Sequence, residues 1–143
     1  MASHTLDPEV VRLLIASGWS PSRRVNEEQF LKYAPGFFPS NRVREILRSF
    51  GGLRVRGLPG SELLEFEPDM AEPHDKWCQI LEPIIGGEFF PIARYGQGAL
   101  VLDEGDRVFA DTGGAIFLFG RTFEQCLELC LLNRGSSLCV WGW

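Results

Sequence analysis

Four carboxylates that lie close together in the sequence are the residues whose types and spacing best suggest chemistry. They are Asp103, Glu104, Asp106 and Asp111. Neighbouring carboxylates can separate their pKa values for acid–base catalysis, and they can bind a hard cation. The spacing of a calcium-binding loop is absent, however, and acidic residues around a Glu-Gly turn are typical of a solvated hairpin. We therefore favour a hairpin turn over a metal or catalytic site.

Other catalytic patterns are missing from the chain. It has two histidines, His4 and His74, and neither lies in a motif. The sequence has no GxxxxGK[ST] phosphate loop, and it lacks the HExxH, GxSxG and GxGxxG patterns. An enzyme needs a nucleophile, an acid–base pair or a bound ion held within reach of one another. The sequence therefore predicts a protein that is not an enzyme and needs no cofactor, with a bound metal or a buried polar pocket as the signs that would favour an enzyme.

The cysteines are the remaining candidates for covalent or metal chemistry. They are Cys78, Cys126, Cys130 and Cys139. The paired, closely spaced knuckles of a zinc site are missing. The first residues, MASHTLDPEVV, lack the basic and apolar regions of a secretory signal, so we expect a cytoplasmic protein with reduced thiols. Cys126 and Cys130 fall on the apolar stripe of a predicted helix, where they act as small buried hydrophobic side chains.

Charge is divided unevenly along the chain. Residues 1–60 carry nine basic and five acidic side chains, a net charge of +4, whereas residues 61–143 carry five and fourteen, a net charge of −9. The basic part contains seven arginines that could contact nucleic acid, namely Arg23, Arg24, Arg42, Arg44, Arg48, Arg54 and Arg56. A nucleic-acid-binding domain gains affinity from a positive face, which the fourteen acids oppose. We therefore expect neither direct nucleic-acid binding nor a membrane partner.

The most acidic segment is ELLEFEPDMAEPHD, residues 62–75, which holds six acidic side chains and no lysine or arginine. Two interpretations remain open. The segment is the solvated outer side of a strand, or it is a docking surface for a basic partner.

Four helices are predicted from caps and apolar periodicity. One begins at Asp7-Pro8-Glu9 and ends at Gly18, and a second begins at Asn26 and ends at Pro35-Gly36. A third begins near Ser40 and ends at Gly51-Gly52. The last begins at the capping box of Thr122 and Gln125 and ends at Asn133-Arg134-Gly135.

The middle of the chain predicts strands. LRVRG and ELLEFE form a hairpin with one solvated face, and GALVLD and DRVFAD form another around Glu104-Gly105. Between them, DKWCQILEPII predicts a short helix broken before Pro83, and FFPIAR a strand with Pro91 at a sheet edge or strand start. AIFLF predicts a strand covered on both faces, and the tail SSLCVWGW a short strand or plug. The fold class is α+β in one domain, residues 1–143, with N-terminal helices, a mostly antiparallel central sheet and a C-terminal helix packed on it.

Several stretches together suggest a family. They are GWSPSRRV at 18–25, LRSFGGLRV at 47–55, FFPIA at 89–93, LVLDEGDRVFA at 100–110 and TFEQCLELCLLNRG at 122–135. In this order the sequence resembles the SUKH superfamily, specifically its third immunity-protein family. Ala93 and Asp106 depart from the usual family pattern, and we expect them to change only local turn geometry.

The resemblance implies a SUKH-like fold and a bacterial immunity protein that binds and neutralises a cognate polymorphic toxin domain, often a nuclease or nucleic-acid deaminase. A toxin of that kind has a basic active-site face, which an acidic surface can block. The expected toxin-binding residues are Glu62, Glu65, Glu67, Asp69, Glu72, Asp75, Trp77, Asp103, Glu104 and Asp106. The alternative is a non-enzymatic scaffold or regulatory protein-binding module, because the wider superfamily includes such proteins. The oligomeric state is left open.

Overall fold

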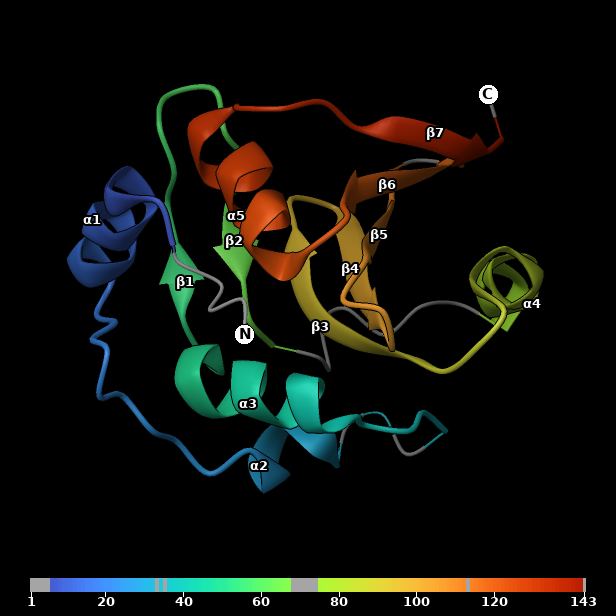
Figure 1. Ribbon diagram of the computed structural model, residues 1–143, viewed down its shortest axis with the longest axis horizontal. Coiled ribbons are helices and arrows are strands. Elements are labelled where there is room, and N and C mark those ends of the chain that lie inside the picture. Colours follow the sequence, from blue (N-terminus) through green and yellow to red (C-terminus); the bar gives the residue numbers. More distant parts are fainter. Residues whose placement is uncertain (1–5, 33, 35, 68–74, 113, 143) are drawn as a thin grey trace.

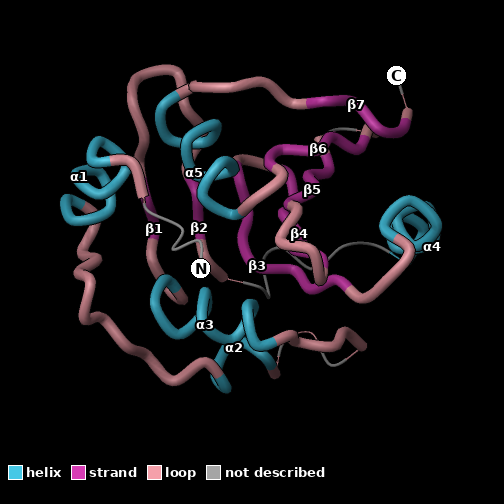
Figure 2. Tube along the Cα trace, viewed as in Figure 1, coloured by secondary structure: helices cyan, strands magenta, loops and turns pink. Residues whose placement is uncertain are grey.

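The structure is a computed structural model that describes residues 6–32, 34, 36–67, 75–112 and 114–142, with the backbone alone for residues 75–77 (Figures 1 and 2). Its helices are α1 (Pro8–Ala16), α2 (Glu28–Leu31), α3 (Asn41–Phe50), α4 (Asp75–Ile85) and α5 (Phe123–Leu132). Its strands are β1 (Arg54–Val55), β2 (Leu64–Glu65), β3 (Phe89–Tyr95), β4 (Gly98–Asp103), β5 (Val108–Asp111), β6 (Ile116–Gly120) and β7 (Leu138–Trp141).

The seven strands that the structure describes form one sheet in which every neighbouring pair is antiparallel. Their order in the sheet is their order in the sequence, from β1 at one edge to β7 at the other. Consecutive antiparallel strands need only short connections, and α4 and α5 are inserted where longer ones occur. The predicted α+β class with an antiparallel sheet is confirmed.

Helices cover both faces of the sheet. Figure 1 shows α1, α3 and α5 on one side and α4 on the other. On the first side, the rings of Phe50, Phe66 and Phe123 lie with their centroids 5.3–6.1 Å apart in the main core. On the second side, Leu81 of α4 packs against a smaller core that includes Phe109. The sheet is therefore the middle of three layers (Figure 1).

The predicted starts of α1, α3 and α5 are confirmed in atomic detail. The carboxylate of Asp7 accepts a hydrogen bond from the N–H of Glu9 at 2.8 Å, and the hydroxyl of Ser40 accepts one from Val43 at 3.2 Å. The Thr122 hydroxyl accepts from the N–H of Gln125 at 3.1 Å. Each cap satisfies a backbone donor that has no partner inside its helix, so these starts are encoded locally.

The corner between α1 and α3 is closed by two of the residues in GWSPSRRV. Trp19 stacks on Phe50 with ring planes 3° apart and donates its indole N–H to the Ser49 hydroxyl at 3.0 Å. The guanidinium of Arg23 donates to the carbonyl oxygens of Ser49 and Gly51 at 2.7 and 2.8 Å. These carbonyls end α3, so Arg23 acts as a C-terminal cap and not as a ligand-binding group.

The predicted extents of two helices were wrong, namely the helix from Asn26 and the helix in DKWCQILEPII. The second helix was expected from Asn26 to Pro35-Gly36, but α2 is only Glu28–Leu31. The helix in DKWCQILEPII was expected to break before Pro83, yet α4 runs through this proline to Ile85. Pro83 costs α4 the one hydrogen bond that its missing N–H would make four residues back, but only two helical residues follow it, and the N–H of Gly86 still donates to the Glu82 carbonyl at 2.8 Å.

Strand burial also differs from prediction. Pro91 was expected at a sheet edge or strand start, and this was wrong, because it lies inside β3, which pairs with both β2 and β4. Among the described residues, β2 pairs with β3 only at Arg94 and Tyr95, so the missing N–H of Pro91 interrupts neither of these pairs. The prediction that AIFLF is covered on both faces was wrong, because the central residues of β6 are half-buried beside an open groove next to α5.

The end of β1 depends on one close backbone approach. A Cβ at Gly57 would lie 2.6 Å from the Cα of Leu131, and the neighbouring Leu58 N–H donates to the Leu131 carbonyl at 2.8 Å. Gly57→Ala is therefore expected to lower the free energy of unfolding by about 1–3 kcal/mol, because backbone atoms on both sides must separate.

Gly36→Ala is the matched control, since a Cβ there meets no atom within 4 Å. We expect it to change the stability by less than about 1 kcal/mol. Urea denaturation of both variants measures the difference, and equal losses would contradict the proposed close packing of Gly57 on α5.

Candidate functional site

The predicted site residues fall into three groups. Some carboxylates are used inside the fold, namely Glu65, Asp103 and Asp106. Others reach solvent, namely Glu62, Glu67 and Glu104. Asp69 and Glu72 lie outside the described residues, as do the side chains of Asp75 and Trp77, whose backbone begins α4.

Asp103 is 4% exposed and organises the β4–β5 turn. Its Oδ1 accepts hydrogen bonds from the N–H groups of Gly105 and Arg107 at 2.9 and 2.8 Å. Its Oδ2 accepts from Arg107 Nε at 2.7 Å. With its acceptors turned into the protein in this way, the Asp103 carboxylate has little surface to offer a partner.

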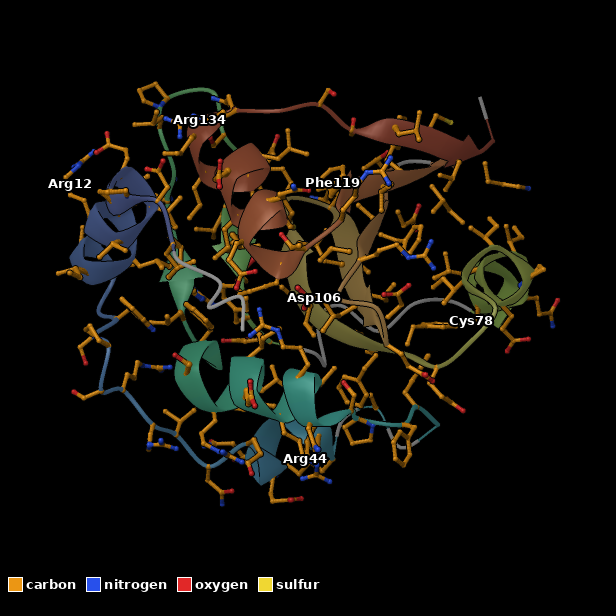
Figure 3. All side chains as sticks on the ribbon, viewed as in Figure 1. Arg12, Arg44, Cys78, Asp106, Phe119 and Arg134 are labelled. Carbon is orange, nitrogen blue, oxygen red and sulfur yellow. The ribbon has the colours of Figure 1, made fainter. Side chains whose placement is uncertain are left out.

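Asp106 joins three elements, as its position between α3 and α5 in Figure 3 shows. Its Oδ1 accepts from Arg42 Nε of α3 at 2.9 Å, and its Oδ2 accepts from the N–H of Phe123 at the start of α5 at 3.2 Å. Arg42 also donates to Glu124 Oε2 of α5 at 2.6 Å. Asp106, which has a φ of 70°, therefore does more than change local turn geometry as expected from the sequence.

The guanidinium of Arg42 is the cation of this junction. Burial lowers the pKa of Arg42, but the hydrogen bonds to Asp106 and Glu124 outweigh burial and raise the pKa above its ordinary value. The guanidinium also lies 5.6 Å from the ring centre of Phe123. This arrangement is a structural ion-pair network that joins α3, the β4–β5 turn and α5.

Glu65 was expected on the solvated face of a strand, and this placement was wrong. Glu65 is 8% exposed, and its carboxylate lies 3.4 Å from Arg54 Nε, its partner across the β1–β2 pair. Because the strands are only two residues long, packing around them decides which side chains reach water.

Most of the arginines in the basic part are also engaged within the protein. Arg23 caps α3, Arg42 and Arg54 are paired as described, and Arg44 pairs with Glu28 at 3.0 Å. Arg48 makes two hydrogen bonds to Glu27, at 2.9 and 3.0 Å, and these lower the pKa of Glu27 to about 2. Of the seven arginines, Arg24 and Arg56 have no ion pair or hydrogen bond among the residues that the structure describes.

The carboxylates without an ion pair in the described part of the chain all belong to the acidic portion. They are Glu62, Glu67, Glu82, Glu88, Glu104 and Asp111. Glu62 lies beside Gly96 in the β3–β4 turn, whereas Glu104 lies in the β4–β5 turn at the other end of β4. The free carboxylates therefore include some at each end of β4, with Glu62 and Asp111 near the β3–β4 turn and Glu88 and Glu104 near the β4–β5 turn, where the sequence predicted one surface.

The group near the β4–β5 turn includes an exposed aromatic ring. Glu104 Oε1 accepts a hydrogen bond from the backbone N–H of Glu88 at 3.0 Å, which places the Glu104 carboxylate beside Glu88. Phe37 packs on Phe89, the residue after Glu88, with ring centres 5.7 Å apart. Its neighbour Phe38 is 64% exposed. We call Phe38, Glu88 and Glu104 the acidic-aromatic end.

Glu82 and Glu88 were not predicted as candidates, because each is a single acid next to apolar residues. Phe37 and Phe38 are both candidates from the sequence for an aromatic anchor that a partner buries, and the structure shows that Phe37 is packed while Phe38 is exposed. The signal available in the sequence was the pair of rings followed by Pro39 and the helix cap Ser40.

The cysteines are free thiols, as predicted. The sulfur atoms of Cys126 and Cys130 lie 3.9 Å apart in the core, and their hydrogen bond, together with burial, raises the pKa of Cys130. Among the described residues, no three His, Cys, Asp or Glu side chains are grouped so that they could hold a metal ion. None of the helices in the described part has the length and apolar character needed to cross a bilayer.

These features define a class: a small α+β protein with a meander sheet between helices and with free charge that is mainly acidic. The chain belongs to the SUKH-3 immunity protein family, whose model matches residues 6–133. No curated protein and no solved structure matches the chain significantly. The resemblance inferred from the sequence is confirmed, and the protein is a member of an immunity protein family.

Removing the cation of the junction should destabilise the fold. Arg42→Met keeps the aliphatic stem but leaves the half-buried carboxylates of Asp106 and Glu124 without their partner. We expect thermal and urea denaturation to show a loss of about 1–3 kcal/mol. The control Arg44→Met removes an exposed pair and should cost less than about 0.5 kcal/mol, so equal losses would argue against the junction.

The Arg48–Glu27 pair gives a direct pH test. In Arg48→Met, the pKa of Glu27 should rise from about 2 toward the ordinary value of 4.5, as measured by NMR titration of its carboxylate. Because the folded pKa is lowered, the pair stabilises the fold above pH 4.5 and loses this effect as pH falls toward about 2. Arg12→Met, which changes a pair on α1, should leave the Glu27 titration as it is; an unchanged value in Arg48→Met would contradict the pairing.

Proposed function

We propose that this immunity protein binds and neutralises a cognate toxin domain that acts on nucleic acid, and that it contacts the toxin through exposed carboxylates. Membership of the SUKH-3 immunity protein family supports the toxin partner. The observation that carries the electrostatic part is the imbalance of free charge. Unpaired, solvent-reaching carboxylates lie between residues 62 and 111, while most arginines of the basic part are held by partners inside the protein.

A nuclease or nucleic-acid deaminase presents a basic face to its phosphate-rich substrate. An inhibitor with complementary carboxylates is steered toward that face and competes with the substrate for it. Steering raises the association rate, which matters when the toxin must be captured before it reaches nucleic acid. The same imbalance of free charge disfavours direct binding of nucleic acid by this protein.

The acidic-aromatic end is the surface that best combines steering with a firm hold. Charge alone gives fast encounter but little residence time, whereas an aromatic side chain buried in a partner's pocket gives much of the binding energy. Phe38 is the exposed aromatic residue closest in the chain to the packed Phe37–Phe89 contact, and Glu88 and Glu104 lie beside that contact. Glu62 and Asp111, near the β3–β4 turn, form the second, purely acidic candidate.

Charge reversal separates the two acidic groups. Glu88→Lys with Glu104→Lys should slow association with the toxin domain encoded beside this chain by about tenfold at low salt, measured by stopped flow. Glu62→Lys with Asp111→Lys changes the net charge by the same amount at the other end of β4 and should have a smaller effect. If only the second pair slows capture, the assignment to the acidic-aromatic end is wrong although toxin binding stands; association that is indifferent to salt would refute electrostatic steering itself.

The aromatic anchor should act on dissociation. Phe38→Ala is expected to raise the dissociation rate at least about tenfold and to leave the association rate nearly unchanged, because the ring contributes after encounter. Ile15→Ala is the matched control, since Ile15 is 53% exposed on α1, away from this end. Equal dissociation rates for both variants and the native protein would remove Phe38 from the interface.

A further inference from the structure

The edge of the sheet formed by β7 is open and apolar. β7 pairs with β6 on one side and is the last strand in the sheet order. Leu138 is 57% and Trp141 43% exposed, and residues 135–142 contain no charged side chain. Figure 1 shows this strand along the rim of the molecule, away from α1 and α3. An exposed edge strand without charge or proline is a template for pairing with another strand.

The opposite edge is built differently. β1 has only two residues, and both Arg54 within it and Arg56 after it are exposed. Short length and exposed charge are the usual devices that prevent a sheet edge from pairing with another chain. The contrast shows that one of the two edges is protected and the other is not.

We propose that β7 pairs with β7 of a second copy of this chain, antiparallel across a twofold axis, so that one sheet continues through both copies. The charge of the molecule restricts where two copies can meet. The chain has a net charge of −5, so two copies repel each other over much of their surface. The uncharged segment 135–142 is a strip on which they can approach closely.

The arrangement is also self-complementary. The register of β7 shifts between Cys139 and Trp141, so Leu138 and Trp141, the partners of Leu118 and Ile116, lie on the same face of the sheet. In an antiparallel pairing centred on the strand, Leu138 of one copy then lies opposite Trp141 of the other, so that the two exposed apolar side chains cover each other. A groove of about 430 Å³ between α5 and β6 has a mixed lining, with Leu118, Phe119, Leu129 and Leu138 beside Arg121, Gln125, Glu128 and Arg134. Because Leu138 lines it, the groove opens where the partner's Trp141 arrives, and its apolar side chains offer surface for the indole ring. Twofold pairing uses the β7 edge of each copy and leaves the protected β1 edges at the two ends of the joined sheet, so the assembly stops at two copies.

The expected dimer is weak. A four-residue strand with two apolar side chains buries much less than the ~1,600 Å² of a standard interface, so we expect a dissociation constant in the range of about 10–100 µM. Phe38, Glu88 and Glu104 belong neither to β7 nor to the groove lining. Dimer formation and toxin binding therefore use different surfaces, and either can fail without the other.

Sedimentation equilibrium from about 5 to about 500 µM tests the proposal with the protein alone. The native chain should pass from monomer to dimer, and Leu138→Lys with Trp141→Lys should raise the dissociation constant at least about tenfold. These changes lower the net negative charge, so weaker association cannot come from greater overall repulsion. The control Ile15→Lys with Phe38→Lys adds the same charge at exposed apolar positions elsewhere and should leave the dissociation constant unchanged.

Cross-linking tests the register. Cys139 is exposed in the middle of β7, so a short bismaleimide should link Cys139 to Cys139 of the second copy, and Cys139→Ser should abolish the product while Cys78 is retained. A native protein that stays monomeric to about 500 µM, or a dimer indifferent to the β7 lysines, would overturn the proposal. The proposal would also be overturned if the native protein were monomeric and Leu138→Lys with Trp141→Lys weakened its binding to the toxin, since the toxin would then occupy this edge.

Discussion

The contact of Arg42 with Asp106 and Glu124 determines how the layers of this protein meet. One guanidinium joins α3, the β4–β5 turn and the first turn of α5, and the same Asp106 caps α5 by accepting from Phe123. Since Phe123 belongs to the ring cluster of the main core, the polar junction and the apolar core position each other. The junction also decides which carboxylates remain for a partner. Asp106 and Glu124 are committed to Arg42, and Asp103 is committed to the turn that presents Asp106, so Glu104 is the acid of this turn that is left for solvent.

Local sequence signals predicted the elements well, because helix starts depend on a few neighbouring atoms. Ser40 and Thr122 cap the helices that follow them, and Asn133 adopts the left-handed conformation that ends α5. The errors concern properties that depend on the whole fold. Whether Pro83 interrupts a helix depends on where in α4 it falls and on the packing of Ile84 and Ile85 against the second core. The burial of β6 depends on how far α5 extends over the sheet, which the uniformly apolar run AIFLF does not encode.

The candidate site shows the same division between composition and placement. The sequence predicted an excess of acid correctly, but Asp103, Glu104 and Asp106 look equivalent in a sequence and have three different environments. Asp103 binds backbone N–H groups, Asp106 binds Arg42, and Glu104 lies exposed beside Glu88. The arginines differ in the same way, since pairing with Glu27, Glu28 and Glu65 depends on contacts between residues distant in the chain. Net charge can therefore be counted before folding, whereas the charge that a partner meets is known only after the internal pairs are assigned.

The free charge and the free apolar surface lie on different elements, and this separation has a physical consequence. Among the described residues, the carboxylates without an ion pair lie in turns and at helix or strand ends, while residues 135–142 of the β7 edge carry no charge. Long-range attraction toward a basic partner acts on the first group and not on the second. Two copies of a chain with a net charge of −5 repel through the acidic groups, and short-range burial of Leu138 and Trp141 is the force that can oppose this repulsion at the edge. Higher salt screens both the attraction to a toxin and the repulsion between copies, so it should weaken capture of the toxin and strengthen pairing of β7. Opposite responses to one variable follow from placing the two kinds of surface apart.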